Sequence, residues 1–447
     1  ALMEQQQGDY EKAIALFKQV KKRYRGQNAY QVKQQAEANI KGSKKAIRQG
    51  VTDRTEKLTQ LDSTINSPYS EFSPTFLNDT AILYASRKVD SLIEVDRGAR
   101  APKRTRFYKA RFEADEGWQH HGPWQNLSDV DGNLGNGAFS PDRKRFYFTK
   151  CRFSTDDQAM RCKLHVAERN GDSWEDPEKL PAPVNTEGSS SSHPATATIT
   201  KSRKEQQVLI FSSNRDQGRG QMDLWYSVYD PADNSYDRPR NLGRKVNTKR
   251  DEVTPFYDSA TDKLFFSSNG HGGFGGLDVY AVTGEFGRYR DDPEHLSAPE
   301  NSPADDLYYR RYEGKAGFLV SNRPGVQALK HKTCCDDLFA TQLPARDTAE
   351  QLLAKTLKGK VVTEKPKDTS AGESEKKTVV TLRQTDTASR EESVLVRDTL
   401  SPEDSGRFRL SVQALAEEQS FYLEASREGY QQATSDSLSR KALANTQ

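Results

Sequence analysis

The sequence has few cysteines, few methionines and no long hydrophobic run, and each shortage excludes a class of protein. Four of the 447 residues are cysteine and three are methionine. Apolar stretches such as residues 81–85 fall far short of the roughly 18 residues that a transmembrane helix needs. The balance of 67 basic and 64 acidic residues leaves a net charge of only +3, so no global field favours nucleic acid. We therefore expect no transmembrane segment and no nucleic-acid partner.

Hydrophobic residues are also scarce, at 34% of the chain, whereas charged residues make up 29%. With 29 glycines and 19 prolines, this composition favours a turn-rich protein over a compact α/β enzyme. The length allows about three domains. We predict a mainly β chain with a short helical segment at one end.

The cysteines fit no zinc pattern, because no Cys-x-x-Cys and no histidine at ligand spacing accompany them. Cys151 ends one apolar strand and Cys162 begins the next, so a hairpin would place them opposite each other and allow a disulfide. This pairing favours an oxidising compartment over buried free thiols. Cys334 and Cys335 are compatible with a strained vicinal bridge and equally with two reduced neighbours.

Residues 1–50 have a helical pattern, with one helix from about Tyr10 and a second over about residues 29–47. The apolar positions recur at helical spacing; they are Tyr10, Ala13, Phe17, Val20, Ala36, Ile40 and Ala46. The segment resembles a tetratricopeptide repeat, in which small residues let paired helices approach closely. One repeat cannot bury its own apolar face. Either further repeats precede Ala1, or the hairpin packs on the domain that follows.

Residues 51–345 contain a repeat in which a proline motif precedes an apolar strand. The prolines are Pro74, Pro141, Pro194, Pro255 and Pro303. A period of roughly 40 to 60 residues with four short strands per unit is what a β-propeller blade requires. Five units predict five blades, with six as the alternative. Because the fifth unit stops soon after its third strand, the segment before Ile65 is expected to supply the outer strand and close the ring.

The repeated motifs resemble the WD40-like (PD40) repeats of periplasmic TolB-type propellers. The resemblance rests on Phe139-Ser140-Pro141-Asp142 and on Met222-Asp223-Leu224-Trp225. After a helix-like linker over residues 346–358, residues 359–447 alternate in the manner of a β-sandwich and resemble a carboxypeptidase-regulatory-like domain. The polar stretch 363–377 is expected to be a solvated loop.

The usual catalytic signatures are missing: there is no Gly-x-Ser-x-Gly, no His-Glu-x-x-His and no Walker loop. His120 and His121 form a cluster with metal potential, although a polar loop is the simpler interpretation. The glycine-rich stretch 270–276 lies between two strands and lacks a helix that would hold a phosphate. Residues 129–133 resemble half a calcium loop without its closing glutamate. We therefore expect no enzyme activity, no cofactor and no metal.

A propeller gathers the loops at one end of its channel, and this funnel is the expected binding site. Basic or polar residues follow the second strand of each unit: Arg87, Lys150, Arg215, Asn269 and Arg323. The loops that lead into the innermost strands add Glu71, Asn136, His193, Glu252 and Asn301. The repeated basic residues favour an acidic peptide or carboxylate. The alternative is that these arginines only pair with carboxylates of neighbouring blades.

The order of the domains resembles the PorE-like lipoproteins of the Bacteroidetes type IX secretion system, whose usual OmpA-like peptidoglycan-binding domain is absent from this sequence. The resemblance implies a periplasmic, outer-membrane-associated scaffold that binds other secretion or gliding proteins and reaches peptidoglycan only through that missing domain. Two alternatives remain open. One is a propeller hydrolase or lyase acting on a polysaccharide or peptide, and the other is a ligand-sensing envelope propeller.

Overall fold

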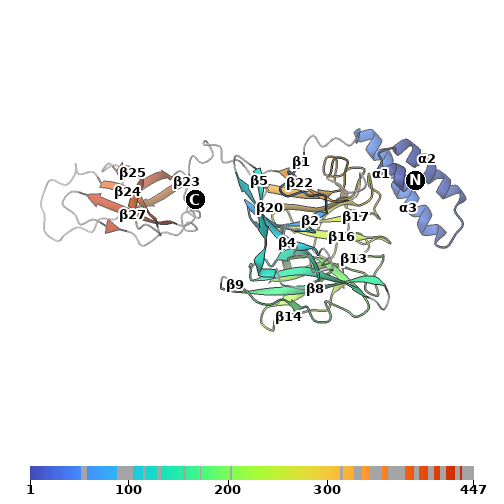
Figure 1. Cartoon of the computed structure of the whole chain (residues 1–447), viewed down its shortest axis with the longest axis horizontal. Helices are drawn as coiled ribbons and strands as arrows, with labels where there is room; N and C mark the ends of the chain where they lie inside the picture. The colour runs from blue at the N-terminus through green and yellow to red at the C-terminus, as the bar shows by residue number, and fades with distance from the viewer. Residues whose placement is uncertain are drawn as a thin grey trace, which may run out of the picture. The chain divides into compact units, whose positions relative to one another are not determined.

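The computed structural model shows a β-propeller with a helical hairpin, and a separate C-terminal β-unit (Figure 1). The structure describes residues 1–51, 58–87, 104–113, 117–127, 132–154, 158–171, 173–201, 204–312, 316–326, 335–342, 355–360, 378–386, 392–400, 407–412, 419–427 and 433–434. The chain divides into the units Ala1–Pro344 and Ala345–Gln447, so the helices share a unit with the propeller. Within the described residues, no helix has the length and apolar content needed to cross a bilayer.

The propeller has five blades, which confirms the five-bladed prediction over the six-bladed one. Blade 1 consists of β2 (Glu71–Asn78), β3 (Ala81–Ser86), β4 (Arg106–Glu113) and β5 (Gly117–Pro123), followed by the short helix η1 (Gln125–Leu127). Blade 2 consists of β6 (Asn133–Phe139), β7 (Arg145–Ser154), β8 (Ala159–Asn170), β9 (Ser173–Trp174) and β10 (Glu178–Lys179). Blade 3 consists of β11 (Ser191–Lys201), β12 (Lys204–Ser213), β13 (Asp223–Asp230), β14 (Ser235–Tyr236) and β15 (Arg240–Asn241).

Blade 4 consists of β16 (Glu252–Asp258), β17 (Lys263–Ser268), β18 (Asp278–Thr283) and β19 (Glu294–His295). Blade 5 joins both ends of the propeller sequence: β20 (Asp306–Tyr312), β21 (Ala316–Ser321), β22 (Asp337–Gln342) and β1 (Thr59–Gln60). β1 pairs antiparallel with β22, with Thr59 opposite Ala340. The segment before Ile65 therefore completes the fifth blade and closes the ring, as the sequence predicted.

The core of the propeller lies between the blades. Each interface between adjacent blades holds one apolar cluster; Phe211 and Leu164, for example, meet between blades 2 and 3. Because each blade packs on both faces, β3 is buried along its whole length rather than on alternate residues. A β-strand buried on both faces is apolar throughout, which explains the short apolar runs of the sequence repeats.

An asparagine that precedes four of the five innermost strands has a structural role. Asn247 accepts a hydrogen bond from the backbone N–H of Leu224 at 2.8 Å and donates to its carbonyl at 2.9 Å. Asn66, Asn185 and Asn301 form the same pair of hydrogen bonds, in each case with the third strand of the preceding blade in the ring. Buried backbone groups must be hydrogen-bonded. The asparagine side chain satisfies the N–H and C=O groups of the third strand where no neighbouring strand pairs with them. Asn301 is therefore a structural residue rather than part of a binding funnel.

The helical hairpin consists of α1 (Leu2–Gln6), α2 (Tyr10–Arg23) and α3 (Ala29–Gln49). Asp9 caps α2 by accepting a hydrogen bond from the Lys12 N–H at 3.2 Å. Ala13 and Phe17 of α2 bury their side chains against Ala36 and Ile40 of α3. The helical apolar pattern of residues 1–50 therefore closes the hairpin.

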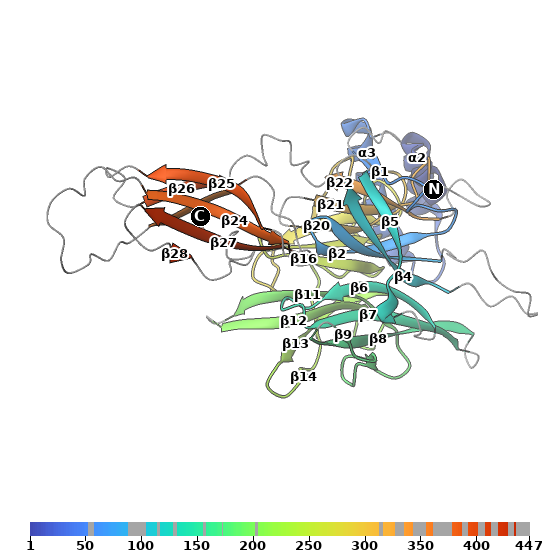
Figure 2. The ribbon, with the colours of Figure 1, turned by 60° about the vertical axis from the view of Figure 1, so that its left-hand side comes forward.

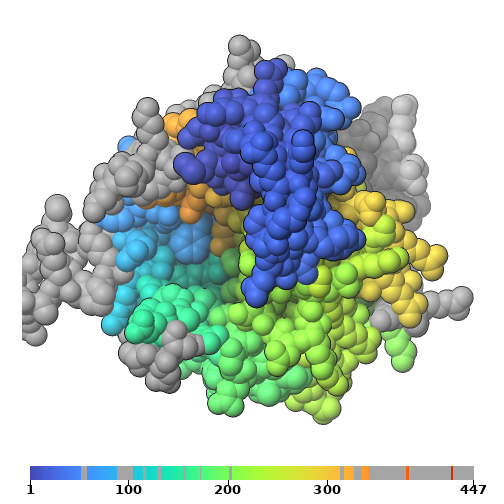
Figure 3. All heavy atoms as spheres, turned by 90° about the vertical axis from the view of Figure 1, so that its right-hand side faces the viewer, coloured from blue at the N-terminus to red at the C-terminus, as the bar shows by residue number. Residues whose placement is uncertain are grey.

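The hairpin docks on the glycine-rich stretch 270–276, which joins β17 and β18. The buried Phe274 packs against Tyr10, Ala46 and Val51, and the Gly273 carbonyl accepts a hydrogen bond from the Gln5 side chain at 2.9 Å. A Cβ on Gly273 would clash with Asp278, which leaves room only for glycine. Figure 3 shows the helices in dark blue across this end of the propeller, beside a central hollow. Of the two sequence alternatives, packing on the following domain is the one observed.

The C-terminal unit has two sheets, in keeping with a sandwich (Figure 2). β23 (Lys355–Lys360) pairs with β26 (Arg407–Val412). The second sheet has the order β25 (Glu392–Leu400), β24 (Thr378–Asp386), β27 (Gln419–Arg427) and β28 (Ala433–Thr434). β23 begins inside the expected linker 346–358, so the end of that linker is strand rather than helix. The loop 363–377 lies outside the described residues.

A disulfide joins Cys151 and Cys162 across the hairpin of β7 and β8, at directly opposed positions with 4.1 Å between the Cα atoms. The sequence predicted this pair from the ends of the two strands. The Cys335 Sγ lies 3.5 Å from the Pro68 carbonyl oxygen. Cys334 lies outside the described residues, so the question of a vicinal bridge stays as the sequence left it.

Candidate ligand site in the propeller channel

Five residues form a strained ring around the channel, one from the innermost strand of each blade. Their φ angles are 58° for Ser73, 56° for Asn136, 52° for His193, 50° for Thr254 and 53° for Tyr308. Each sits where the strand pairing shifts register, as in a β-bulge. A non-glycine residue held at positive φ costs about 1–3 kcal/mol, and such residues cluster at functional sites. We call these five residues the bulge ring.

The bulge ring is held together by contacts between blades. A bulge removes a backbone N–H from the strand ladder, and a neighbouring hydroxyl accepts it instead. The Gly137 N–H donates to Ser73 Oγ at 2.9 Å, and the Tyr308 N–H donates to Thr254 Oγ1 at 3.3 Å. The His193 N–H donates to Thr149 Oγ1 at 3.2 Å. The strained conformation is therefore fixed by the surrounding structure.

Tyr308 extends across the channel from blade 5. Its hydroxyl donates a hydrogen bond to Asn136 Oδ1 on blade 2, and its ring lies 6.1 Å from Phe72 and 5.9 Å from His193, centroid to centroid. The half-buried His193 ring places Nδ1 2.9 Å from Ser192 Oγ. A phenol, an amide and an imidazole therefore meet at the middle of the channel.

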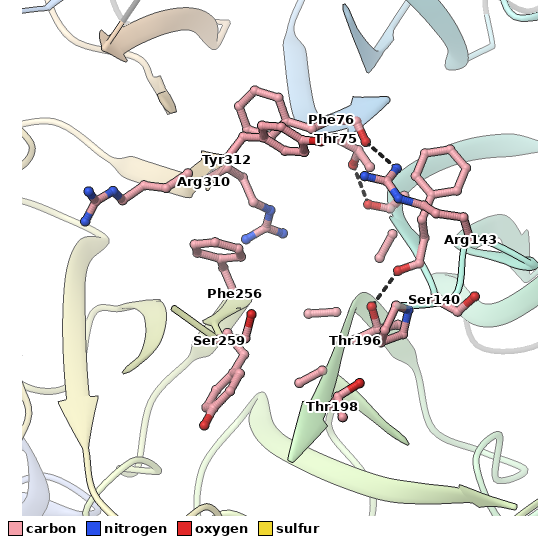
Figure 4. Close-up of a pocket in the computed structure, with 18 residues that line it drawn as sticks. Thr75, Phe76, Ser140, Arg143, Thr196, Thr198, Phe256, Ser259, Arg310 and Tyr312 are labelled. Carbon is pink, nitrogen blue, oxygen red and sulfur yellow. Dashed lines mark hydrogen bonds between the residues drawn. The ribbon is translucent and has the colours of Figure 1, made fainter. Parts of the chain in front are cut away.

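A pocket of about 480 Å³ opens beyond the bulge ring, between the distal halves of the innermost strands (Figure 4). A cavity of this size accommodates a small organic ligand. Its lining comprises Thr75, Phe76, Gly137, Ala138, Phe139, Ser140, Pro141, Arg143, Ala195, Thr196, Ala197, Thr198, Phe256, Tyr257, Ser259, Arg310, Arg311 and Tyr312. Aromatic rings, hydroxyls and three arginines line this channel pocket, and none of these described residues is acidic.

Arg310 is the most buried charged residue of the channel pocket. The residue is 9% exposed, and its guanidinium lies 5.4 Å from the Phe256 ring, above which Figure 4 shows it pointing inward. Its hydrogen bonds are two long ones, to the carbonyls of Thr254 at 3.5 Å and Tyr309 at 3.3 Å. Burial lowers the pKa of Arg310 to about 10. Within the described chain no carboxylate pairs with Arg310, which is unusual for a buried charge.

Arg143 stands across the channel pocket from Arg310, in the turn after β6 (Figure 4). Its guanidinium donates to the Phe76 carbonyl at 2.8 Å and lies 5.0 Å from the Phe139 ring. The Thr75 and Thr196 hydroxyls donate to the carbonyls of Gly137 and Phe139, at 2.6 and 2.5 Å, and so fix neighbouring strands. These bonds hold the walls of the pocket together, and among the described residues that line it Arg310 is the buried charge without a carboxylate partner.

The electrostatics of the bulge ring and the channel pocket are linked. Burial first, and the Arg310 charge second, lower the pKa of His193 to about 4. Burial also raises the pKa of Tyr308. At neutral pH the channel therefore holds a cationic guanidinium beside a neutral imidazole and a neutral phenol. This arrangement suits an anion at Arg310.

Two of the sequence-predicted funnel residues, Arg215 and Arg323, prove to be structural. Arg323 donates to Asp306 at 2.5 Å, to the Pro299 carbonyl at 3.0 Å and to the Glu300 carbonyl at 3.2 Å. Arg215 similarly donates to the carbonyls of Pro183 at 3.0 Å and of Val184 and to Ser191 Oγ at 3.2 Å. These bonds tie the loop before the innermost strand to the second strand. Both guanidiniums are thus held within their own blades, mainly by backbone carbonyls, and not by carboxylates of neighbouring blades, which was the alternative weighed from the sequence.

The predicted acidic residues Glu71 and Glu252 are structural in the same way. Glu252 accepts hydrogen bonds from the Thr248 hydroxyl at 2.7 Å and the Ser268 hydroxyl at 2.8 Å. Glu71 accepts from Ser67 and Ser86, both at 2.6 Å. Burial raises the pKa of each carboxyl to about 7. Both carboxyls lie at the beginnings of their strands, away from the channel pocket.

The remaining predicted funnel residues are spread over the same end of the propeller. Arg87 is exposed after β3, and Lys150 lies within β7 opposite Leu134. Asn269 donates to Asp251 at 3.3 Å, and its carbonyl accepts from Gln35 of α3 at 2.9 Å. Part of this end is therefore occupied by the helical hairpin. Of the predicted set, only His193, together with Asn136, belongs to the bulge ring.

The sequence contained a signal for the bulge ring. The prolines that mark the repeats directly follow Ser73, His193 and Thr254, so the repeated motif marks three of the five positions, whereas the restriction before a proline favours extended backbone and not the positive φ observed. No proline follows Tyr308, so an alignment of the repeats on their prolines does not identify Tyr308 as the equivalent residue. Arg310 could not have been found this way, because its lack of a counterion is visible only in three dimensions.

The other candidate sites do not assemble into a metal centre. His120 Nδ1 lies 2.7 Å from the Tyr84 hydroxyl, and His121 Nε2 lies 3.4 Å from Glu113. Across the described residues no group of three or more His, Cys, Asp or Glu side chains converges. Residues 129–131 of the calcium-like stretch lie outside the described residues.

Comparisons with known proteins match the chain by structure only. No protein-family model and no curated protein sequence matches it. A thermostable family-43 glycoside hydrolase shares 9% identity at a TM-score of 0.36, over 62% of this chain and 89% of the hydrolase. A B. megaterium levansucrase mutant shares 12% identity at a TM-score of 0.38, over 64% and 85% of the two chains. A Lactobacillus gasseri sucrose-6-phosphate hydrolase shares 10% at a TM-score of 0.38, over 95% of both.

These matches correct two expectations from the sequence. A non-enzymatic secretion scaffold and the absence of enzyme activity were expected, yet the similar structures are glycoside hydrolases rather than envelope scaffolds. At identities of 9 to 12% the likeness concerns the fold. The function must therefore be argued from the channel pocket itself.

Proposed function

We propose that the propeller binds an acidic saccharide in the channel pocket, with the ligand carboxylate on Arg310. The observation that carries this proposal is the buried Arg310 guanidinium without a carboxylate partner among the described residues. Burying an unpaired charge lowers the stability of a folded protein by roughly several kcal/mol. Such a charge is tolerated where a ligand supplies the counterion. Arg323, which is also buried, has Asp306 as its counterion.

A charge-assisted bond between a guanidinium and a carboxylate is stronger than a neutral hydrogen bond, and an Arg fork can bind both oxygens. The dry surroundings of Arg310 strengthen it further, since water competes poorly there. The aromatic rings of Phe76, Phe139, Phe256 and Tyr312 supply flat apolar surfaces around it. Sugar rings offer apolar faces of matching size. A uronic acid combines such a face with one carboxylate.

The channel pocket does not offer the carboxylate pair that glycoside hydrolysis ordinarily uses, because its described lining contains no Asp or Glu. The buried carboxyls Glu71 and Glu252 are occupied by hydroxyl donors elsewhere in their blades. Recognition of the acidic saccharide is therefore the function that the geometry supports best.

Calorimetric titration with uronic acid oligosaccharides tests this proposal, with the methyl-esterified oligosaccharides as the matched neutral ligands. The esters should bind at least tenfold more weakly, because a hydrogen bond to a charged group contributes about 1.5–3 kcal/mol. Raising the salt concentration should weaken the binding of the acidic oligosaccharide and leave the binding of the ester unchanged. Equal affinities for acid and ester would overturn the proposal. So would tight binding of an acidic peptide with no binding of any saccharide.

We also propose the periplasmic, outer-membrane-associated location that the family resemblance implies. The Cys151–Cys162 disulfide supports it, since such bonds persist in oxidising compartments. Fractionation of the native cells tests this location. Recovery of the protein in the cytosolic fraction would contradict it.

A further inference from the structure

We propose that the helical hairpin binds the surface of a membrane that carries anionic phospholipids, through a groove lined with lysines. The groove lies between α2 and α3, and it shares no lining residue with the channel pocket. Binding to a membrane surface is therefore independent of the ligand proposed for the channel.

Positive charge is concentrated in the hairpin. Residues 1–50 contain 11 basic and four acidic residues, which gives a net charge of +7. The remaining residues contain 56 basic and 60 acidic residues, and their net charge is −4. An anionic surface therefore attracts the hairpin and repels the rest of the chain, which favours one orientation of approach.

The groove has a volume of about 530 Å³. Lysines from both helices line it, three from α2 and two from α3: Lys18, Lys21, Lys22, Lys41 and Lys44. We call it the lysine groove. Among the described residues a single carboxylate pairs with these lysines: Glu37, whose Oε2 lies 3.0 Å from Lys21 Nζ. Like charges spaced three or four residues apart on a helix repel each other, so the lysine groove favours a bound anion.

The lysine groove and the propeller lie on different faces of α3. The helix docks on the propeller through Gln35, which donates to the Asn269 carbonyl at 2.9 Å, and through Gly42, where a Cβ would meet the Gly273 carbonyl. Lys41 and Lys44 are exposed to solvent on another face. The cations of the groove are therefore accessible to a surface while the hairpin stays docked.

Exposed apolar side chains lie on the same face of α3 as the groove lysines. Tyr30 is 73% exposed and Ile47 is 44% exposed. Positions 30, 37 and 44 are seven residues apart, and positions 40, 44 and 47 are four and three residues apart, so they form one stripe along the helix. A stripe that combines cations with exposed apolar groups suits the boundary between phospholipid headgroups and acyl chains.

The lysine groove contains no arginine among its described lining residues. Arginine suits planar carboxylates in fixed positions, because its guanidinium binds both oxygens at once. The ammonium group of lysine acts as a point charge and accepts phosphates in many orientations. The headgroups of a fluid bilayer have no fixed orientation. The groove therefore suits an anionic bilayer better than the carboxylates of a folded partner protein.

Sedimentation of the whole chain with lipid vesicles tests this proposal. Phosphatidylcholine vesicles that contain about a third phosphatidylglycerol should bind the protein at least tenfold more tightly than pure phosphatidylcholine vesicles. Replacement of three groove lysines (Lys18→Gln, Lys41→Gln, Lys44→Gln) should weaken binding to the anionic vesicles about a hundredfold, because each cation near the surface contributes a factor of about five. Tyr30→Ser should also weaken this binding. Arg310→Met should leave it unchanged.

The matched control replaces three exposed propeller lysines, Lys144, Lys179 and Lys204, by glutamine and so removes the same charge. The control should bind the anionic vesicles as the wild type does. Equal binding to both kinds of vesicle would overturn the proposal, and so would equal losses in the groove variant and the control.

Two competitors distinguish the membrane surface from other anions. Inorganic phosphate should displace the protein from the vesicles no better than sodium chloride of the same ionic strength. Stronger displacement by phosphate would assign the groove to the free ion and overturn the proposal. Tighter binding of polyglutamate than of the anionic vesicles would overturn it in favour of an acidic protein. None of these results affects the proposed binding in the channel pocket.

Discussion

The hydroxyl of Tyr308 on β20 donates a hydrogen bond across the propeller channel to Asn136 on β6, 172 positions earlier in the chain. Both residues hold positive φ angles at equivalent positions of their blades. A contact between two such strained positions ties blade 5 to blade 2 through the middle of the ring. It also separates the end of the channel that faces the helices from the channel pocket.

This contact should contribute to stability. Tyr308→Phe removes the donor and leaves Asn136 Oδ1 without it, so we expect the free energy of unfolding to fall by about 1 kcal/mol. Chemical denaturation measures the change. As a comparison, Tyr257→Phe removes an exposed hydroxyl that donates to Asp262 at 3.0 Å and should have a smaller effect. Equal losses in the two variants would contradict the role of the cross-channel bond.

Arg310 on β20 and Arg323 after β21 are both buried. Replacing each by methionine should change the free energy of unfolding in different ways. Arg323→Met leaves Asp306 as an unpaired buried charge and should cost about 3–5 kcal/mol of unfolding free energy. Arg310→Met removes a buried charge that has no counterion, so the free energy of unfolding should stay unchanged or rise. Thermal denaturation of both variants without ligand distinguishes them. A large loss for Arg310→Met would mean that Arg310 is structural.

Stability should fall as the pH rises through the range in which Glu71 and Glu252 lose their protons. Burial raises the folded pKa of each to about 7, above the ordinary value of 4.5. The folded state therefore binds more protons than the unfolded state between pH 4.5 and 7, and stability decreases across this window. Each carboxyl accounts for roughly 3 kcal/mol at most.

Unfolding free energies of wild type and the Glu71→Gln, Glu252→Gln double variant, measured across this pH range, test the assignment. The variant should lose most of the pH dependence, because glutamine does not titrate. A variant that retains the slope of the wild type would assign the dependence to other groups.

The Cys151–Cys162 disulfide should affect one hairpin rather than the whole ring. It closes a loop of 11 positions, and the chain-entropy model gives less than the ~3 kcal/mol of a 15-residue loop. Peptide mapping of protein purified without reductant should recover the linked peptides. Two separately alkylated cysteines in protein from the native compartment would contradict the bond.

Much of the fold was predictable because it depends on local patterns. The proline motifs and apolar runs indicated five blades, and the incomplete fifth unit indicated that a segment before Ile65 closes the ring; β1 beside β22 confirms this. The glycine-rich stretch 270–276 was recognised only as a loop. The helices pack on this stretch because Phe274 contacts Tyr10. No local sequence pattern encodes that contact.

The site was less predictable than the fold, because charge repeats alone do not reveal partners. Arg215 and Arg323 follow the second strands of their blades, which led to a funnel prediction, but nearby carbonyls occupy both guanidiniums. Arg310 does not belong to that repeat. Its position corresponds to Thr75 in blade 1 and Phe256 in blade 4, so it is an exception to the repeat. The candidate binding residue, Arg310, therefore lies at a position where blade 5 differs in sequence from blades 1 and 4.

The most direct test of this account is calorimetric titration of a uronic acid oligosaccharide into wild-type protein and into the Arg310→Met variant, at one modest salt concentration. The account predicts a variant that folds at least as stably as the wild type and binds the ligand at least tenfold more weakly. Binding of equal strength by the folded variant would contradict it, because Arg310 would then not hold the ligand carboxylate.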